Sequence, residues 1–274
     1  NAFVTLFDSE VKQAYQGQRL LAGVTRERVG VEGSTVRFPK IGKGSATIRV
    51  PQTDVTPLNV SYSQVTATME DYIAAEYSDI FQQQKVNFNE RQELVQVVSG
   101  AIARRMDQVV LDALDASGTT ATVDNDVGGS DSNLNIEKLR EAKNLLDTNN
   151  VPMEGRTMLL HANSLQALLG ETETTSADFN TVRALVTGEI NTFMGFRFIT
   201  FGDRDEGGLP VDGSNDRTLY AFHRDAVGLG IGMNQTSRVD YIPEKTSFLV
   251  ASMFSAGAVA IDDEGIVKLT CRES

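Results

Sequence analysis

Apolar and polar side chains alternate with a period of two near the start of this chain. Residues 36–38 and 46–50 follow this pattern, and Gly42 and Gly44 lie between them. The pattern predicts two half-buried strands joined by a glycine-rich turn. A two-stranded hairpin is only marginally stable in water, and this one has little core of its own. We therefore expect another chain to supply the missing apolar contacts, which makes assembly the leading hypothesis.

Farther along the chain, the period changes to that of a helix. Residues 89–116 carry apolar side chains at spacings of three and four, which predicts one long amphipathic helix. Asn87 and Glu90 have the spacing of a capping box at its start. The apolar stripe consists of Leu94, Val98, Ala101, Ile102, Met106, Val109, Val110 and Leu114. A shorter helix is predicted at residues 4–15, within an N-terminal arm.

The second half of the chain alternates helices and strands. It begins after a loop rich in Thr, Asp, Gly and Ser at residues 119–132, which reads as a boundary. The apolar spacing predicts helices at residues 136–146, 164–169 and 179–186 and a long acidic loop at 203–217. Strands are predicted at residues 157–160, near 196–199, and at 220–222, 227–231, 247–251, 256–261 and 266–269; before the long helix, a further strand falls within 60–69. The sequence therefore predicts an α+β fold.

Composition excludes several classes of protein. With 274 residues, of which 41% are hydrophobic, the chain can bury a real core. Its net charge of -12 argues against tight nucleic-acid binding. No apolar run approaches the roughly 20 residues that span a bilayer, and the first residues lack the basic start of a secretion signal. The single cysteine, Cys271, allows no intrachain disulfide and fits a reducing compartment.

Charges of opposite sign occupy neighbouring segments. The hairpin carries four basic residues that we take as candidate contacts: Arg37, Lys40, Lys43 and Arg49. Residues 52–84 contain no Lys or Arg, and the candidate acidic contacts in this segment are Glu70, Asp71, Glu76 and Asp79. We expect these two surfaces to meet between neighbouring copies of the chain. Two ordinary solvated faces are an equally good interpretation, because surface charge pairs contribute little individually.

The candidate chemistry is sparse. His161 and His223 are far from each other and from any metal-binding spacing, so structural roles are favoured. Residues 124–131 and 212–216 resemble calcium loops, but neither has the closing Glu. The glycines of residues 228–232 suit a strand better than a phosphate loop. Since no convincing nucleophile or acid pair stands out, we expect no enzymatic activity, no cofactor and no bound metal.

In its order of elements, the chain resembles the major capsid proteins of tailed bacteriophages, especially those of short-tailed phages. Residues 33–42, with a phrase of the type FPxIG, followed by residues 46–51, look like the extended loop of that family. Residues 89–116 are similar to its spine helix, and Arg104 to Leu111 matches the stretch that runs into a small-residue loop. Residues 188–196 and 254–267 look like its late strands. The resemblance covers nearly the whole chain.

The resemblance implies an architecture of four parts. These are an N-terminal arm (1–31), an extended β-hairpin loop (32–69), a peripheral domain (70–120 and 237–262) with spine helix 89–116, and an axial α/β domain (121–236 and 263–274). Hinges are expected at residues 30–33, at 51–57 at the base of the loop, and at 119–132.

The same resemblance implies a structural role. Many copies would form the hexamers and pentamers of an icosahedral virion capsid, assembled in the host bacterial cytoplasm around double-stranded DNA that is not tightly bound. Portal and scaffolding proteins would be partners, a decoration protein an optional one, and no membrane would be involved. An encapsulin-like compartment and an α/β enzyme with a hidden acid pair remain as alternatives.

Overall fold

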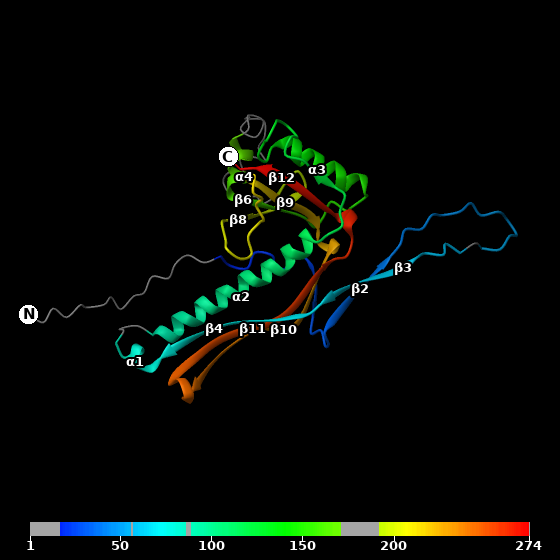
Figure 1. Ribbon diagram of the computed structural model, residues 1–274. Helices are drawn as coiled ribbons and strands as arrows, with labels where there is room; N and C mark the ends of the chain where they lie inside the picture. Colours follow the sequence, from blue (N-terminus) through cyan, green and yellow to red (C-terminus); the bar gives the residue numbers. More distant parts are fainter. Residues whose placement is uncertain (1–16, 56, 86–88, 171–191, 274) are drawn as a thin grey trace, which may run out of the picture.

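The described part of the chain forms a four-stranded sheet, a six-stranded sheet and a projecting two-stranded arm, together with one long helix and several shorter helices (Figure 1). The computed structural model describes residues 17–55, 57–85, 89–170 and 192–273. The predicted helices at 4–15 and 179–186, and Asn87 of the predicted capping box, lie outside these residues. None of the helices in the described part is long and apolar enough to cross a membrane.

The first sheet has four strands in the order β1, β10, β11, β4. Strand β1 (Arg26–Val29) is parallel to β10 (Val227–Ile242), which is antiparallel to β11 (Ser247–Ala260), and β11 is antiparallel to β4 (Glu70–Asp79). The two strands predicted at 247–251 and 256–261 are thus one continuous strand. A short helix, α1 (Ile80–Gln83), follows β4, and a single 3-10 turn, η2 (Pro243–Lys245), joins β10 to β11.

The predicted long helix is confirmed as α2 (Glu90–Asp115), and it covers one face of this sheet. Its buried apolar residues include Val98, Ile102, Met106, Val110 and Leu114. The Arg105 guanidinium lies 4.6 Å from the centre of the Tyr72 ring on β4. At the start of the helix, the Glu90 carboxylate accepts a hydrogen bond from the Ser78 hydroxyl at 2.8 Å. Packing across β4 and β11 therefore fixes the helix along its length.

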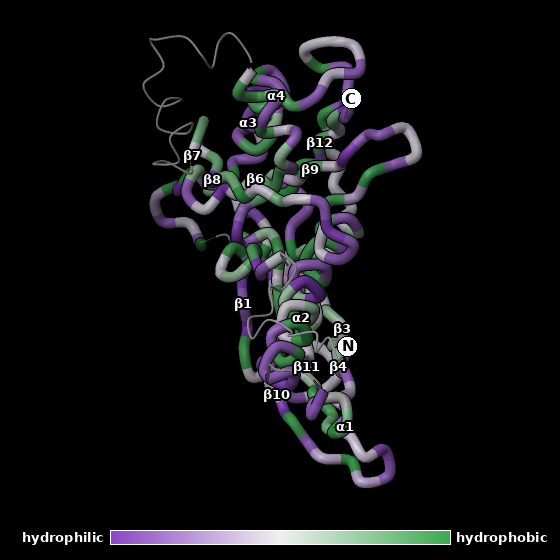
Figure 2. The backbone as a smooth tube through the Cα atoms, turned by 90° about the vertical axis from the view of Figure 1, so that its left-hand side faces the viewer, coloured by the Kyte–Doolittle hydropathy of each residue, from purple (hydrophilic) through white to green (hydrophobic). Residues whose placement is uncertain are grey.

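The second sheet has six strands in the order β5, β12, β9, β6, β8, β7. Their bounds are Thr122–Val123, Ile266–Arg272, Asp216–His223, Arg156–His161, Phe196–Phe201 and Thr192–Phe193. Helices α3 (Ile136–Thr148) and α4 (Ala162–Gly170) pack with this sheet, as predicted from the apolar spacing. Every residue of β6 is buried. Figure 2 shows this sheet at one end of the molecule and the narrow extension of α2 and the long strands at the other.

Besides the path from β4 through α2 to β5, the described chain crosses between the sheets at two short 3-10 turns. Turn η1 (Arg224–Ala226) leads from β9 to β10, and η3 (Asp263–Gly265) leads from β11 to β12. The Ala226 carbonyl accepts hydrogen bonds from the backbone N–H groups of Ile261 (2.7 Å) and Asp262 (3.2 Å). We call η1, η3 and residues 261–262 the joint.

The projecting arm, which consists of β2, β3 and the loop between them, differs from the predicted hairpin. Strand β2 (Thr35–Ile41) pairs with β3 (Tyr62–Thr68), not with residues 46–50, which form no strand. The turn is at Pro51 and Gln52, where the Thr53 N–H donates to the Val50 carbonyl at 3.4 Å and Gln52 has a φ of 65°. Residues 51–55 therefore lie at the far end of the arm, and the expectation that the hinge over 51–57 lies at the base of the arm was wrong.

The base of the arm is also better packed than the sequence indicated. Val36, Phe38, Ala67 and Ile261 form a small buried cluster within the chain. Glycines provide the space: a Cβ on Gly230 would lie 2.6 Å from Val36, and one on Gly257 would lie 2.0 Å from the Thr68 carbonyl oxygen. The expectation that another chain covers the apolar face holds no longer for the base, because β10 and β11 of the same chain already cover it.

Candidate assembly surface

The outer half of the arm, described for residues 42–55 and 57–61, is the part without a core. Its apolar side chains are exposed: Ile48 retains 95% of its accessible surface and Val55 88%, and Val50 and Leu58 are also exposed. One backbone pair, from the Gly42 N–H to the Ser61 carbonyl at 2.8 Å, closes its base. Exposure of several large apolar side chains on one projecting segment is typical of an interaction site.

The four basic candidates occupy different environments. Lys40 Nζ lies 2.8 Å from Asp262 Oδ1, and Lys43 Nζ lies 2.6 Å from Glu264 Oε2. The hydrogen bond that Lys43 donates to Glu264, and the charge of this carboxylate, raise the pKa of the Lys43 amine. Within the described residues, no ion pair is found for the side chains of Arg37 or Arg49. The two lysines are thus occupied inside the subunit, whereas the two arginines offer their charge to solvent.

The four acidic candidates on β4 lie on two faces. Successive side chains of a strand alternate in direction, and Tyr72 and Ser78 contact α2. Glu70 and Glu76 therefore share the helix-covered face, where Glu70 accepts a hydrogen bond from the Tyr72 hydroxyl. Asp71 and Asp79 lie on the opposite face. None of these acids meets the four arm bases in the described part of the subunit, and the predicted contacts between copies stay a proposal.

The face opposite to α2 has a covered part and an open part. The base of the arm covers Gly228, Gly230 and Gly257. Farther out on the same face, Ile73 is 67% exposed, Tyr77 is also exposed, and their ladder partners Met253 and Leu249 are half-buried. We call Ile73, Tyr77, Leu249 and Met253, with Asp71 and Asp79, the open face.

One buried carboxylate was missed by the sequence patterns. Asp107 on α2 is fully buried and accepts hydrogen bonds from the backbone N–H groups of Leu20 (2.9 Å) and Leu21 (3.0 Å). Arg204 Nη1 lies 3.3 Å from the same carboxylate. Burial raises the pKa of Asp107 despite these partners. The signal was available, because Asp107 follows Met106 on the apolar stripe of the helix. This side chain ties the end of the N-terminal segment to α2.

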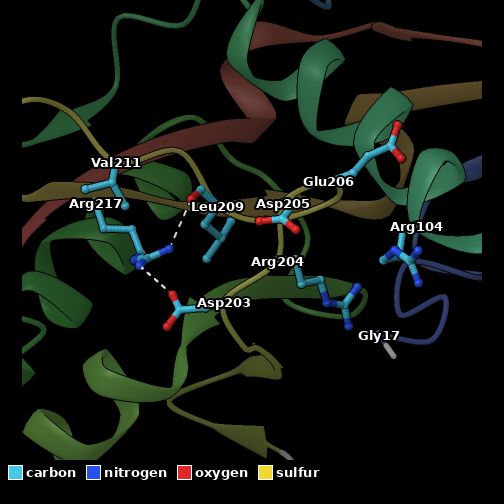
Figure 3. Close-up of a pocket in the computed structure, with 9 residues that line it drawn as sticks. All are labelled: Gly17, Arg104, Asp203, Arg204, Asp205, Glu206, Leu209, Val211 and Arg217. Atoms are coloured by element: carbon cyan, nitrogen blue, oxygen red, sulfur yellow. Dashed lines mark hydrogen bonds and ion pairs between the residues drawn. The ribbon is translucent and has the colours of Figure 1, made fainter. Parts of the chain in front are cut away.

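A cavity of about 600 Å³ lies beside this anchor (Figure 3). Its charged lining is largely paired: Arg217 contacts Asp203 at 3.2 Å and Glu273 at 2.7 Å, and Glu206 contacts Arg105 on α2 at 3.2 Å. Arg217 also donates to the Leu209 carbonyl at 3.1 Å. These pairs connect the loop after β8 to α2 and to the C-terminal residues, which is a structural arrangement.

The two histidines take part in local structure. His161 Nδ1 accepts from the Asn163 N–H at 3.3 Å and lies 3.0 Å from Glu273. His223 Nε2 lies 2.8 Å from the Glu154 carbonyl, and its Nδ1 accepts from the Asp225 N–H. No group of His, Cys, Asp and Glu suited to a metal ion occurs among the described residues.

The two acidic loops that resembled calcium sites are organised by protein groups. Arg272 lies 3.0 Å from Asp131 and 2.5 Å from Asp216, so it bridges the two loops. Asp212 accepts hydrogen bonds from the backbone N–H groups of Ser214 and Asp216, as in an Asx turn. The contact with Arg272 lowers the pKa of Asp216. These carboxylates thus contribute to the fold of the loops.

Comparison with known proteins identifies the class of the molecule. The sequence matches the family described as phage capsid protein over residues 1–273. Among solved structures, the head of Helicobacter pylori bacteriophage KHP40 is similar with a TM-score of 0.79 and 12% identity, covering 99% of this chain and 96% of that one. The capsid of cyanophage P-SCSP1u is similar with a TM-score of 0.77 and 14% identity, covering 100% and 94%. No curated protein sequence matches the chain.

A third solved structure, from Mycobacterium phage Che8, has a TM-score of 0.74 and 17% identity, covering 98% of this chain and 97% of that one. The fold is therefore that of phage capsid proteins. The chain belongs to the phage capsid protein family, and the resemblance inferred from its sequence is confirmed.

Proposed function

We propose that this chain is the major shell protein of a bacteriophage, that its copies form hexamers and pentamers of an icosahedral capsid, and that the shell encloses double-stranded DNA. Its role is structural, not enzymatic. Assembly takes place in the host bacterial cytoplasm with portal and scaffolding proteins, and a decoration protein is an optional partner. The net charge of -12 fits a shell that does not hold its DNA tightly.

The observation that carries this proposal is the exposed outer half of the arm. An apolar segment with Ile48 at 95% exposure is costly to leave in water, since each apolar side chain gains roughly 1.5–3 kcal/mol on full burial. We propose that it packs on the open face of a neighbouring copy, where Ile73 and Tyr77 are exposed. Both surfaces are then covered by the same contact.

The geometry of one subunit supports a contact between copies. Strand β3 ends at Thr68 and β4 begins at Glu70, so the chain passes from the base of the arm directly into the four-stranded sheet. The arm and the far end of β4 consequently project in opposite directions (Figure 1). The outer half of the arm is directed away from the open face of its own subunit.

Charge supports the same arrangement. Arg49 lies among the exposed apolar residues of the arm, and Asp71 and Asp79 flank the apolar part of the open face. Individual exposed ion pairs contribute only about 0–1 kcal/mol, so their main effect is to select orientation and partner. We keep the remaining candidates, Arg37, Glu70 and Glu76, as weaker contacts of the same kind.

The test is the size of the purified protein together with one charge reversal. We expect particles of megadalton size by light scattering and closed shells by electron microscopy. A monomer or a small oligomer under assembly conditions would contradict the proposal. Arg49→Glu should lower the yield of shells several-fold, and Asp71→Arg or Asp79→Arg in the same chain should restore part of it. Arg197→Glu, an exposed arginine on the six-stranded sheet, is the matched control and should leave the yield unchanged.

A further inference from the structure

The joint between the two sheets is a single packed unit. The Ala226 carbonyl of η1 accepts two backbone hydrogen bonds, from Ile261 and from Asp262, so one crossing is hydrogen-bonded directly to the other. Gly265 of η3 lies against Ala226, since a Cβ built on this glycine would be 2.8 Å from the Ala226 Cβ. Movement of one crossing therefore requires movement of the other.

The two lysines of the arm reach this joint. Lys40 contacts Asp262 at 2.8 Å, and Lys43 contacts Glu264 at 2.6 Å. Asp262 Oδ1 also accepts from the backbone N–H of Glu264 at 3.2 Å, so this carboxylate belongs to the turn itself. Asn149, at the end of α3, donates to the Glu264 carbonyl at 3.0 Å. Residues 262–264 of the joint thus contact both the arm and the end of α3.

Apolar packing also connects the base of the arm to the joint. Phe38 on β2 lies against Gly228, where a Cβ would be 2.8 Å from its ring, and Gly228 is two residues after Ala226. Ile261 packs in the same buried cluster. Packing therefore fixes the position of β2. Lys40 and Lys43 lie close to the end of β2 at Ile41, so their ion pairs are placed to determine the angle at which the outer half of the arm leaves the two large sheets.

We propose that Lys40 and Lys43, with Asp262 and Glu264, form a clasp that couples the angle of the arm to the joint between the two sheets. When the sheets bend relative to each other, the clasp carries the arm with them. Both ion pairs are partly exposed, so each is weak enough to open and reform. The consequence for a shell rests on the proposed function: copies that bend differently would present their arms at different angles.

The clasp gives these lysines a role different from a contact with a neighbour. In an inter-subunit role, a charge change at Lys43 would be compensated by a change on the open face of another copy. In the clasp, it is compensated by Glu264 of the same chain. Lys43→Glu combined with Glu264→Lys therefore distinguishes the two. Glu264 is the better choice for the swap, because Asp262 also holds the turn.

The experiment measures the arm angle within one chain. Spin labels at Thr47→Cys on the arm and Asn144→Cys on α3 occupy exposed positions, and Cys271 is fully buried. Labelled chains are diluted with excess unlabelled chains so that only intrachain distances contribute. We expect a narrow distance distribution in the parent, at least a twofold wider one in Lys43→Glu and in Glu264→Lys, and a narrow one again in the swap. Lys43→Gln should widen it as well.

Two outcomes would overturn the clasp: an unchanged distribution in the single variants, or a swap that stays as wide as they are. A thermal melt of each variant identifies any general loss of folding, and the swap must melt like the parent for its distances to count in favour. Because the distances are intrachain, the clasp can fail while shells still form, and it can hold even if the chain forms no shell.

Discussion

At the scale of single residues, Asp107 is unusual because its carboxylate is removed from water. It is a fully buried carboxylate on the apolar stripe of α2, and two backbone N–H groups and Arg204 are its partners. A buried charge is retained only when hydrogen bonds and counter-charges offset the loss of water. Here the raised pKa indicates that burial outweighs them.

This gives a pH-dependent prediction. Because the pKa of Asp107 is higher in the folded chain than its ordinary value of 3.8, the folded state binds this proton more tightly than the unfolded state. The stability contributed by Asp107 therefore falls as the pH rises from about 3.8 to the folded pKa, and is constant above it. The fall amounts to about 1.4 kcal/mol for each unit between the two pKa values.

Asp107→Asn removes the titration and keeps one acceptor. The difference in unfolding free energy between the parent and this variant, measured by urea titration across a pH series, should shrink with rising pH and then level off. A difference that grows with pH would mean that the partners lower the pKa instead.

At the scale of elements, the glycines of β10 and β11 show what a sequence pattern can and cannot give. The alternation of Val227, Leu229 and Ile231 predicted a strand, and it is confirmed within β10. That the glycines between them receive Val36 and Phe38 of β2 was not predictable. Nothing in the local pattern records which distant strand lies above a glycine.

Gly257→Ala tests this packing. The added methyl would lie 2.0 Å from the Thr68 carbonyl oxygen, so β3 must move. We expect a loss of about 1–3 kcal/mol, the usual range for overpacking, seen as a lower thermal midpoint and faster hydrogen exchange in β2 and β3. Gly213→Ala is the matched control, because a Cβ there meets nothing within 4 Å. Equal effects of the two substitutions would rule out a special role for the close packing of Gly257 against β3.

The arm itself shows the limit of pattern reading at this scale. Residues 46–50 alternate like a strand, yet β2 pairs with residues 62–68. Alternation identifies segments that suit a sheet, but pairing depends on register and on the turn. The turn is at Pro51 and Gln52. The prediction placed it at Gly42 and Gly44, because glycines favour turns, and this was wrong.

At the scale of the whole molecule, the order of elements was predictable and their arrangement was not. The long helix, the helices predicted at 136–146 and 164–169 and most strands follow from apolar spacing, and the family follows from the order of elements. The four-stranded sheet joins strands that begin at residues 26, 70, 227 and 247. Such distant pairings are not recorded in local periodicity. For the same reason, Asp262 and Glu264 were not expected beside Lys40 and Lys43.

Removing the outer half of the arm separates its function from folding. Gly42 and Ser61 already form a backbone hydrogen bond, so Asn-Gly in place of residues 43–60 should close the shortened hairpin. Since the base is packed within the chain, we expect a thermal midpoint within a few degrees of the parent and no shells. Mixed with full-length chains at one part in ten, the shortened chain should reduce the yield of closed shells more than in proportion. Normal yield in the mixture would contradict a contact made by the arm.

The opposite directions of the arm and the open face have a further consequence. The proposed contact joins two different patches and is therefore heterologous, so one copy would give its arm and receive another. Such contacts close into a ring only when the rotation between neighbours divides a full turn, and they continue as an open array otherwise. In the proposed assembly, the number of copies in a ring would then be set by one angle, and the proposed clasp at the joint would adjust it.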